Sequence, residues 1–345
     1  MEEKRDKAAE NFKQEYDELE EKIDEALKCL GRGYDESCEK LICDEGVESP
    51  RFARAALEAG IFYPNFLYQN ADADTRDRLI SLLEDYGTED VFGALTALAA
   101  IGDETTAECF VKWEDHPRLW MKKLVSHPMH YAKAGGWVVE QGERRQLYFD
   151  RCYALEKAED DNLEENVFGG VCEDSCPSCG SKFVNELVVD GGDERLAFLG
   201  IPGKIKIKYC AACVAEMDYS FCRWQENGES EFIGWEFAGK PWSPKIPPDG
   251  SGTVCADVWS KHSRFVLSQE PVSMNYCKRD KRNAIGGRPC FLNHPNTHFA
   301  KCPRCGKTMT HLAQLDATYC SLGVGVEYVQ ICKSCKTAAV SFMDT

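Results

Sequence analysis

The chain has 345 residues, a length that permits two or three domains, and its hydrophobic content of 43% is that of a globular protein. Its formal net charge is −17 and its pI is near 5.0. This charge argues against broad binding to nucleic acid or to an anionic membrane and favours a basic protein partner. The alternative is that the acidic charge serves only to keep the protein soluble.

The first segment, residues 1–30, is rich in Glu and Lys and carries apolar residues at alternating spacings of four and three. These are Phe12, Tyr16, Leu19, Ile23, Ala26 and Leu30. The spacing predicts an amphipathic helix that packs on the same chain. Because this segment lacks the apolar core of a signal peptide, and no run approaches the roughly 18 apolar residues that span a bilayer, we expect a cytoplasmic protein.

Residues 31–128 keep a helical pattern in short units that end at glycine. One unit runs from Leu79 to Tyr86 before Gly87, and another from Val91 to Ile101 before Gly102. Thr88 is expected to cap the second of these, and Asp103 the helix that follows. Residues 94–115 resemble a HEAT-type helical repeat, which implies stacked helical pairs with a protein-binding face. A small irregular helical domain is the alternative.

Beyond residue 128 the pattern changes to short β-like runs, such as Gly136–Glu140 and Gln146–Leu155. An acidic connector at residues 156–166 leads to the cysteine-rich part. The sequence therefore predicts an α+β protein in which the helical front is followed by a duplicated, mainly antiparallel β region. Its predicted modules are residues 129–283 and 284–345.

Eight of the nineteen cysteines form four C-x-x-C pairs, and the pairs occur in two similar settings. In each setting a Gly-Gly precedes a C-P-x-C-G turn, an aspartate (Asp190 or Asp316) follows eleven positions after its second cysteine, and another C-x-x-C closes the copy. This parallel predicts an internal duplication. The two cysteine sets are Cys176, Cys179, Cys210 and Cys213, and Cys302, Cys305, Cys332 and Cys335.

Two residues between cysteines let both sulfurs of a tight turn face one metal ion, and a glycine after the turn can adopt positive φ. We therefore predict two structural Zn ions, one held by each set of four cysteines. Four thiolates fill a tetrahedral zinc and leave no position for water, so neither site is expected to be catalytic. Redox-active thiol pairs are the alternative for these motifs. Cys172 and Cys320 are the nearest substitute ligands, but they and the other cysteines are expected to be apolar fillers.

These motifs resemble a group of β-rich zinc-knuckle proteins that includes the YwqG-like domains and the programmed-cell-death-2 family. The resemblance is clearest where Gly286-Gly287, the turn at Cys302–Gly306, Gln314-Leu315-Asp316 and the pair Cys332/Cys335 follow one another. It covers residues 165–345. In the programmed-cell-death-2 branch it implies a binder of a ribosomal protein, whereas the helical front is a departure from both branches.

The other motifs give only weak indications of a functional site. The segment Gly234–Lys240 matches the start of a phosphate-binding loop, but Pro241 replaces the Ser or Thr that binds magnesium. His294 and His298 are separated by Pro295, which favours a loop over a metal site. A basic run (Lys278, Arg279, Lys281, Arg282 and Arg288) and the Lys204, Lys206 and Lys208 face are the best case for RNA contact.

The leading hypothesis is a non-enzymatic cytoplasmic adaptor or chaperone-like protein, stabilised by two zinc ions, with a protein partner and with no nucleic-acid or membrane ligand. One alternative is an enzyme or small-ligand binder with a pocket between the two β modules, drawing on Asp190, Asp316, Gln314 or Trp224. The other alternative is a local RNA binder.

Overall fold

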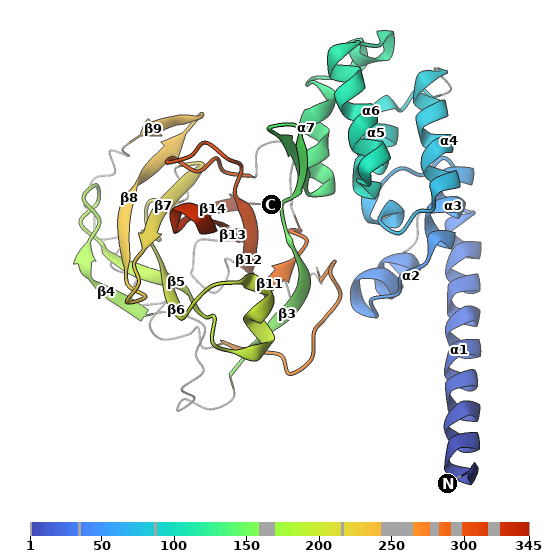
Figure 1. Ribbon diagram of the computed structural model, residues 1–345, viewed down its shortest axis with the longest axis horizontal. Helices are drawn as coiled ribbons and strands as arrows, with labels where there is room; N and C mark the ends of the chain where they lie inside the picture. The colour runs from blue at the N-terminus through green and yellow to red at the C-terminus, as the bar shows by residue number, and fades with distance from the viewer. Residues whose placement is uncertain are drawn as a thin grey trace. The chain divides into compact units, whose positions relative to one another are not determined.

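The computed structural model describes residues 2–33, 36–85, 88–158, 170–214, 217–242, 265–276, 283–290, 299–316 and 325–344. It confirms an α+β protein, with helices first and antiparallel sheets after them (Figure 1). The chain divides into two compact units, Met1–Gly135 and Gly136–Thr345. In the described part of the chain, no helix is both long enough and apolar enough to cross a membrane.

The first unit is helical. Its α-helices are α1 (Glu2–Leu30), α2 (Glu36–Glu39), α3 (Pro50–Glu58), α4 (Ala73–Glu84), α5 (Val91–Ile101), α6 (Glu104–Asp115) and α7 (Pro128–Ala132). Short helical turns cover Lys40–Asp44, Asn65–Tyr68, Leu119–Lys123 and Lys133–Gly135. Helix α5 is buried on nearly all sides because it consists almost entirely of small and apolar residues. It is the centre around which the neighbouring helices pack.

The caps of α5 and α6 explain where these helices begin and end. Asp103 caps α6, because its carboxylate accepts a hydrogen bond of 2.8 Å from the Thr106 N–H, as predicted. Gly102 ends α5 in the left-handed conformation at φ 56°. The prediction for the start of α5 was wrong: Asp90 caps it through the Gly93 N–H, and the Thr88 hydroxyl instead accepts from the Asp90 N–H. The predicted stop at Tyr86–Gly87 lies outside the described residues.

The second unit contains a hairpin, a nine-stranded sheet and a three-stranded sheet, and all their strand pairs are antiparallel. The hairpin is β1 (Trp137–Glu140) with β2 (Glu143–Gln146). The large sheet has the order β10 (Phe265–Leu267), β3 (Phe149–Lys157), β11 (Ala284–Gly287), β12 (Thr310–Asp316), β13 (Gly325–Cys332), β14 (Thr337–Asp344), β7 (Tyr219–Trp224), β8 (Ser230–Phe237) and β9 (Lys240–Trp242). The small sheet is β4 (Gly170–Ser175), β5 (Lys182–Asp190) and β6 (Lys204–Tyr209).

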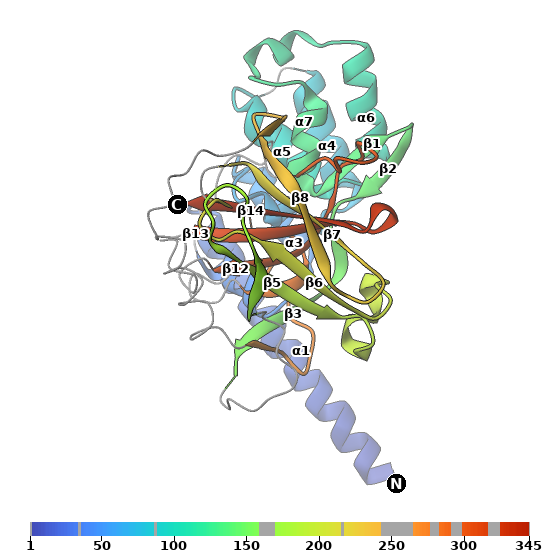
Figure 2. The same cartoon turned by 90° about the vertical axis from the view of Figure 1, so that its left-hand side faces the viewer.

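The main hydrophobic core lies between the two larger sheets, with side chains such as Leu187 and Ile207 from the small sheet and Val329 and Val340 from the large one. Figure 2 shows the strands that enclose it from the side. Strands from both predicted modules, 129–283 and 284–345, belong to the same nine-stranded sheet. The two cysteine groups therefore sit in one compact unit. Most of the predicted acidic connector lies outside the described residues.

Strand β13 is buried along its whole length, on both faces. Its inner face includes Glu327, whose carboxylate accepts a hydrogen bond of 3.0 Å from the Tyr209 hydroxyl within the core. On its outer face, Gln330 accepts from the Ala300 N–H at 2.7 Å, and Tyr328 donates to the carbonyl of Cys290. The polar residues of this strand thus satisfy buried groups of adjoining segments.

Candidate metal centres

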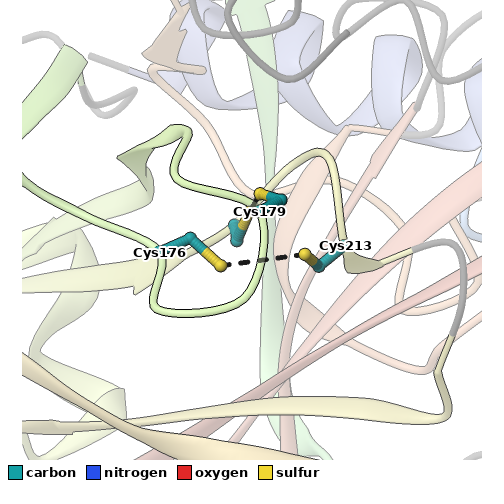
Figure 3. A group of neighbouring side chains, drawn as sticks. Cys176, Cys179 and Cys213 are labelled. Carbon is teal, nitrogen blue, oxygen red and sulfur yellow. Dashed lines mark hydrogen bonds between the residues drawn. The ribbon is translucent and has the colours of Figure 1, made fainter. Parts of the chain in front are cut away.

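The first cysteine group is built from two turns. Cys176 and Cys179 lie in the turn between β4 and β5, and Cys210 and Cys213 directly follow β6. Figure 3 shows Cys176, Cys179 and Cys213 of this group beside one another. The first turn is closed by two hydrogen bonds, from the Cys176 N–H to the Ser181 carbonyl (2.7 Å) and from the Gly180 N–H to the Cys176 carbonyl (2.9 Å). Gly180 has φ 76°, the positive φ predicted for this position.

The second group repeats this geometry. Cys302 and Cys305 lie in the turn before β12, Cys332 is the last residue of β13, and Cys335 lies in the turn that follows it. The Cys302 N–H donates to the Lys307 carbonyl (2.8 Å), the Gly306 N–H donates to the Cys302 carbonyl (2.9 Å), and Gly306 has φ 72°. The two turns therefore share their hydrogen bonds and their backbone conformation, as their matching C-P-x-C-G sequences predict.

The sulfur atoms of each group are spaced as ligands of one metal ion. The Sγ atoms lie 3.7 Å apart for Cys176 and Cys213, 3.6 Å for Cys179 and Cys210, and 3.7 Å for Cys305 and Cys332. All four ligand atoms in each group lie within 4.8 Å of one another. Four sulfurs bound to zinc at about 2.3 Å lie about 3.8 Å apart in a regular tetrahedron. Disulfides need about 2.05 Å, and these cysteines are free. Each group can therefore hold one metal ion.

Backbone hydrogen bonds favour thiolates in both turns. The Cys176 sulfur accepts from the N–H groups of Cys179 and Ser178, and the Cys302 sulfur accepts in the same way from Cys305 and Arg304. In the second group, the Lys307 N–H lowers the pKa of Cys305, whereas burial raises the pKa of Cys302 to about 12. Both turns thus point backbone dipoles at the sulfur atoms.

The pKa values of the thiols in the first group depend on one another. Hydrogen bonds from Cys210 and then Cys213 lower the pKa of Cys176, while the hydrogen bond to Cys176 raises the pKa of Cys213. The first thiolate is thus stabilised by its neighbours, and each further ionisation brings like charges together. A bound divalent cation offsets that repulsion, which is why four deprotonated cysteines at this spacing fit a metal ion.

The two groups differ in exposure. All four cysteines of the first group are buried, whereas Cys305 is exposed and Cys335 is half-buried in the second. The first group packs in one apolar cluster with Phe183, Met217 and Trp235. The second group also packs with apolar residues, such as Tyr219, Phe221 and Met309, but its Cys305 is exposed.

Cys172 does not join the first group. Its Sγ lies 3.5 Å from the Asn185 Oδ1, and burial raises its pKa to about 11. Cys152 and Cys222 are buried thiols, as expected of apolar fillers. Cys290 departs from that expectation because it is disulfide-bonded. Cys320 lies outside the described residues.

The residues predicted for an enzymatic pocket have structural contacts. Gln314 accepts from the Cys290 N–H (2.8 Å) and donates to the Tyr276 carbonyl (3.1 Å), while Trp224 is part of the main core. Asp190 ends β5 and accepts from the Gly192 N–H, and the Asp316 N–H donates to the Asn283 side chain at the end of β12. Gln314 therefore fixes two backbone segments. Sequence reasoning missed this role, although an isolated polar residue within an apolar strand was a signal for it.

The predicted basic face is ion-paired. Lys204 lies 3.6 Å from Asp190, Lys206 is 2.5 Å from Glu229, and Lys208 makes two contacts of 2.9 Å with Asp174. Ile205 and Ile207 are buried between these lysines, as the alternation predicted, but Lys208 is buried as well. These ion pairs leave little unbalanced positive charge for RNA on this strand.

The remaining motifs give no further site among the described residues. Gly234–Lys240 forms the end of β8 and a tight turn into β9, with Ala238 and Gly239 at positive φ, so this segment is a hairpin and no phosphate loop. Arg288 stacks over the Tyr148 ring at 4.7 Å. The other members of the basic run, and His294 and His298, lie outside the described residues.

Fold and site together define an α+β protein with two four-cysteine groups in its β unit, each of which can hold a metal ion. No family model matches the chain, and no solved structure matches it. The chain is similar to a protein of Salmonella typhimurium described as uncharacterized protein YpfL, with 31% identity over 292 residues. The similarity covers 81% of this chain and 64% of that protein, so the chain spans less than two thirds of its relative's length. The YwqG-like resemblance stays a prediction.

Proposed function

We propose that both cysteine groups bind zinc and that each ion has a structural role. The sulfur spacing of 3.6–3.7 Å supports this proposal. Zinc prefers four tetrahedral ligands and accepts thiolates, and four thiolates leave no coordination position for a substrate. Metal analysis of the purified chain, with any tag removed, tests the proposal: two zinc ions per chain are expected. A content well under two, with oxidised thiols, would show that these are redox pairs.

We further propose that the β unit arose by duplication around the two centres. The same order of elements supports this. In the first copy a cysteine turn is followed by β5, β6, a second cysteine pair and β7, and in the second copy by β12, β13, a second cysteine pair and β14. The copies differ in pairing, because β12, β13 and β14 are neighbours in one sheet whereas β5 and β6 lie in the small sheet and β7 in the large one.

For the whole chain we propose a non-enzymatic, cytoplasmic, protein-binding adaptor or chaperone-like role. The observation that carries it is the pair of four-cysteine groups, because an ion held by four thiolates has no coordination position left for a substrate and stabilises the fold instead. The helical unit supports it through the sequence α4, α5 and α6, whose buried central helix and short Gly-Asp connection are typical of HEAT-like stacking. We propose that this unit presents the partner-binding surface.

Gentle purification of the tagged chain from its source organism, with and without nuclease, tests the adaptor role. A stoichiometric protein partner that survives nuclease treatment is expected and would be identified by mass spectrometry. A chain that emerges without any protein would refute a stable adaptor. Loss of the bound material on nuclease treatment would instead favour the RNA-binding alternative.

A further inference from the structure

The helical unit contains an open cavity of about 590 Å³. Its lining comes from the end of α3 and the segment after it, from α4, and from the segment that leads into α5. Helix α4 packs against both α3 and α5 (Figure 1), so the fold brings these three stretches together. The volume lies within the roughly 300–1,000 Å³ of ligand sites. All lining residues belong to the helical unit, so this cavity is complete within one compact unit.

The apolar part of the cavity is fixed by the surrounding fold. Phe62 is 8% exposed, and its ring stacks on the buried ring of Tyr68, with 6.5 Å between the centroids. Gly93, in the first turn of α5, permits the close approach of this helix, because a Cβ there would lie only 2.8 Å from the Phe62 Cβ. Leu57 and Leu82 are half-buried. The cavity therefore offers apolar surface beside a ring that is held in place.

Arg78 supplies the only positive charge of the lining among the described residues. It is exposed, and its side chain has no ion pair or hydrogen bond in the part of the chain that the structure describes. Arg76, on the same helix, pairs instead with Asp77 and Asp103, each at 2.7 Å. Arg78 and Leu82 are four residues apart on α4, so both lie on the side that faces the cavity. The Arg78 guanidinium is thus available to a ligand.

Three carboxylates line the same cavity, and none of them forms an ion pair with Arg78. Glu58 and Glu89 are exposed, and neither side chain has an ion pair or a hydrogen bond among the described residues. Asp90 is exposed as well and accepts one hydrogen bond, from the Gly93 N–H. With three carboxylates and one guanidinium, the lining has two negative charges in excess. Its two kinds of charge do not neutralise each other, so a matching ligand carries both a cation and an anion.

The exposure of the lining favours a peptide over a small molecule. Small-molecule sites cover most of the surface of their ligand. Here all four charged lining residues are exposed, as are Ala59 and Gly60. A peptide segment needs cover on one side only and gains from separate apolar and charged contacts. A carboxylate, a basic side chain and an apolar side chain occur together at the carboxyl end of a chain that ends in basic and apolar residues.

We propose that this cavity binds the carboxyl-terminal residues of a partner protein. The terminal carboxylate pairs with Arg78, since a guanidinium matches a carboxylate through two parallel hydrogen bonds. An apolar side chain of the terminal residues packs on Phe62, and a Lys or Arg pairs with Glu58 and Glu89. This inference rests on the proposed adaptor role and names the part of the partner that is recognised.

A library of random peptides of about six residues, displayed with free carboxyl ends, is the first probe. We expect the full chain to select peptides that combine an apolar residue with Lys or Arg. Fluorescence anisotropy then compares a selected peptide with its amidated copy. Amidation should weaken binding to the parent chain at least about tenfold and binding to Arg78→Gln less than about twofold, because that variant has no cation left to lose. Arg32→Gln removes an exposed arginine outside the cavity and should bind both peptides as the parent chain does.

The acidic side of the cavity has its own test. Glu58→Gln/Glu89→Gln should weaken binding of the selected peptide about fivefold, and a peptide with Met in place of its Lys or Arg should show no such difference. The matched control, Glu21→Gln/Glu25→Gln, makes the same charge change on exposed residues of α1 and should stay within about twofold. Ala59→Phe places a ring in the cavity from an exposed position and should weaken every selected peptide. Circular dichroism verifies that each variant keeps its helices.

Several results would overturn the proposal: a library that selects nothing, equal binding of free and amidated peptides to the parent chain, or unchanged binding by Arg78→Gln. Purification from the source organism separates this inference from the adaptor role. A partner that is lost with Arg78→Gln and retained with Arg32→Gln is expected. If the partner accompanies both variants equally, only the cavity inference fails; if no partner accompanies the parent chain, the adaptor role itself fails.

Discussion

The unequal burial of the two cysteine groups predicts that a chelator removes their metal ions at very different rates. In the second group the exposed Cys305 offers a ligand sulfur directly to solvent. In the first group all four cysteines are buried in one cluster with Phe183 and Met217, which are 2% and 6% exposed, so we expect a chelator to reach the metal only after these side chains move. Uncovering each of these side chains costs about 1.5–3 kcal/mol. The opening therefore costs about 3–6 kcal/mol, which slows release by about two to four orders of magnitude.

The assay is release of zinc into a chromogenic chelator from fully loaded protein. We expect two phases of one equivalent each. Cys305→Ser should abolish the fast phase alone, and Cys179→Ser the slow phase alone. Trp235 packs with the first group, so its fluorescence should change with the slow phase, and Trp235→Phe should remove that change. Release of both ions at one rate, or a fluorescence change in the fast phase, would refute the reasoning.

Three further predictions concern stability, and urea unfolding measures each of them. Gly306→Ala places a side chain at φ 72° in open space, so it should lower the free energy of unfolding by about 1 kcal/mol through backbone strain alone, and no loss would contradict the assigned turn. Burial lowers the pKa of His311 from 6.5 to about 3, so the unfolded chain binds the proton first and stability is lost as pH falls below 6.5. The free energy of unfolding should fall by about 2 kcal/mol between pH 7 and pH 5, and His311→Leu should remove this loss. If the free energy of unfolding of the variant depends on pH as it does in the parent chain, His311 is not the source. Asp174→Asn leaves the buried Lys208 amine without its carboxylate and should cost about 2 kcal/mol, whereas Lys208→Met should cost less, and the reverse order would show that the ion pair matters less than packing.

The sequence predicted the cysteine groups well because their chemistry is local. A C-P-x-C-G turn fixes its own backbone through two short-range hydrogen bonds and one positive φ, and both copies adopt this geometry. The helices α5 and α6 were predictable for the same reason, since Gly102 and Asp103 end one helix and start the next. The predicted Thr88 cap was wrong because Thr88 and Asp90 are both capable of capping, and it is the Asp90 carboxylate that accepts from the Gly93 N–H.

The pairing of strands that lie far apart in the chain could not be predicted from the sequence. Nothing local shows that β11, from the second module, lies between β3 of the first module and β12. The exposed lysine face was also expected from alternation alone, but its charge balance depends on Asp174 and Glu229, which approach from other strands and turns. The roles of Gln314 and Gln330 likewise depend on the segments at Cys290 and Ala300, which pack against the sheet.

The placement of the two centres gives them different mechanical roles. Cys176 and Cys179 enter the first centre from the β4–β5 turn of the small sheet, whereas Cys210 and Cys213 lie on the connection from β6 to β7 of the large sheet. A metal ion there links the β4–β5 turn of the small sheet to the connection that leads from β6 to β7 of the large sheet. Each centre joins the turn before one strand to the end of its hydrogen-bonded neighbour, β5 with β6 and β12 with β13, but at the second centre the chain continues into β14 of the same sheet. Loss of the first ion should therefore loosen the packing of the small sheet on the core, and loss of the second should remain local. Hydrogen exchange separates the two outcomes, because only the first should expose the amides of β5 and β6.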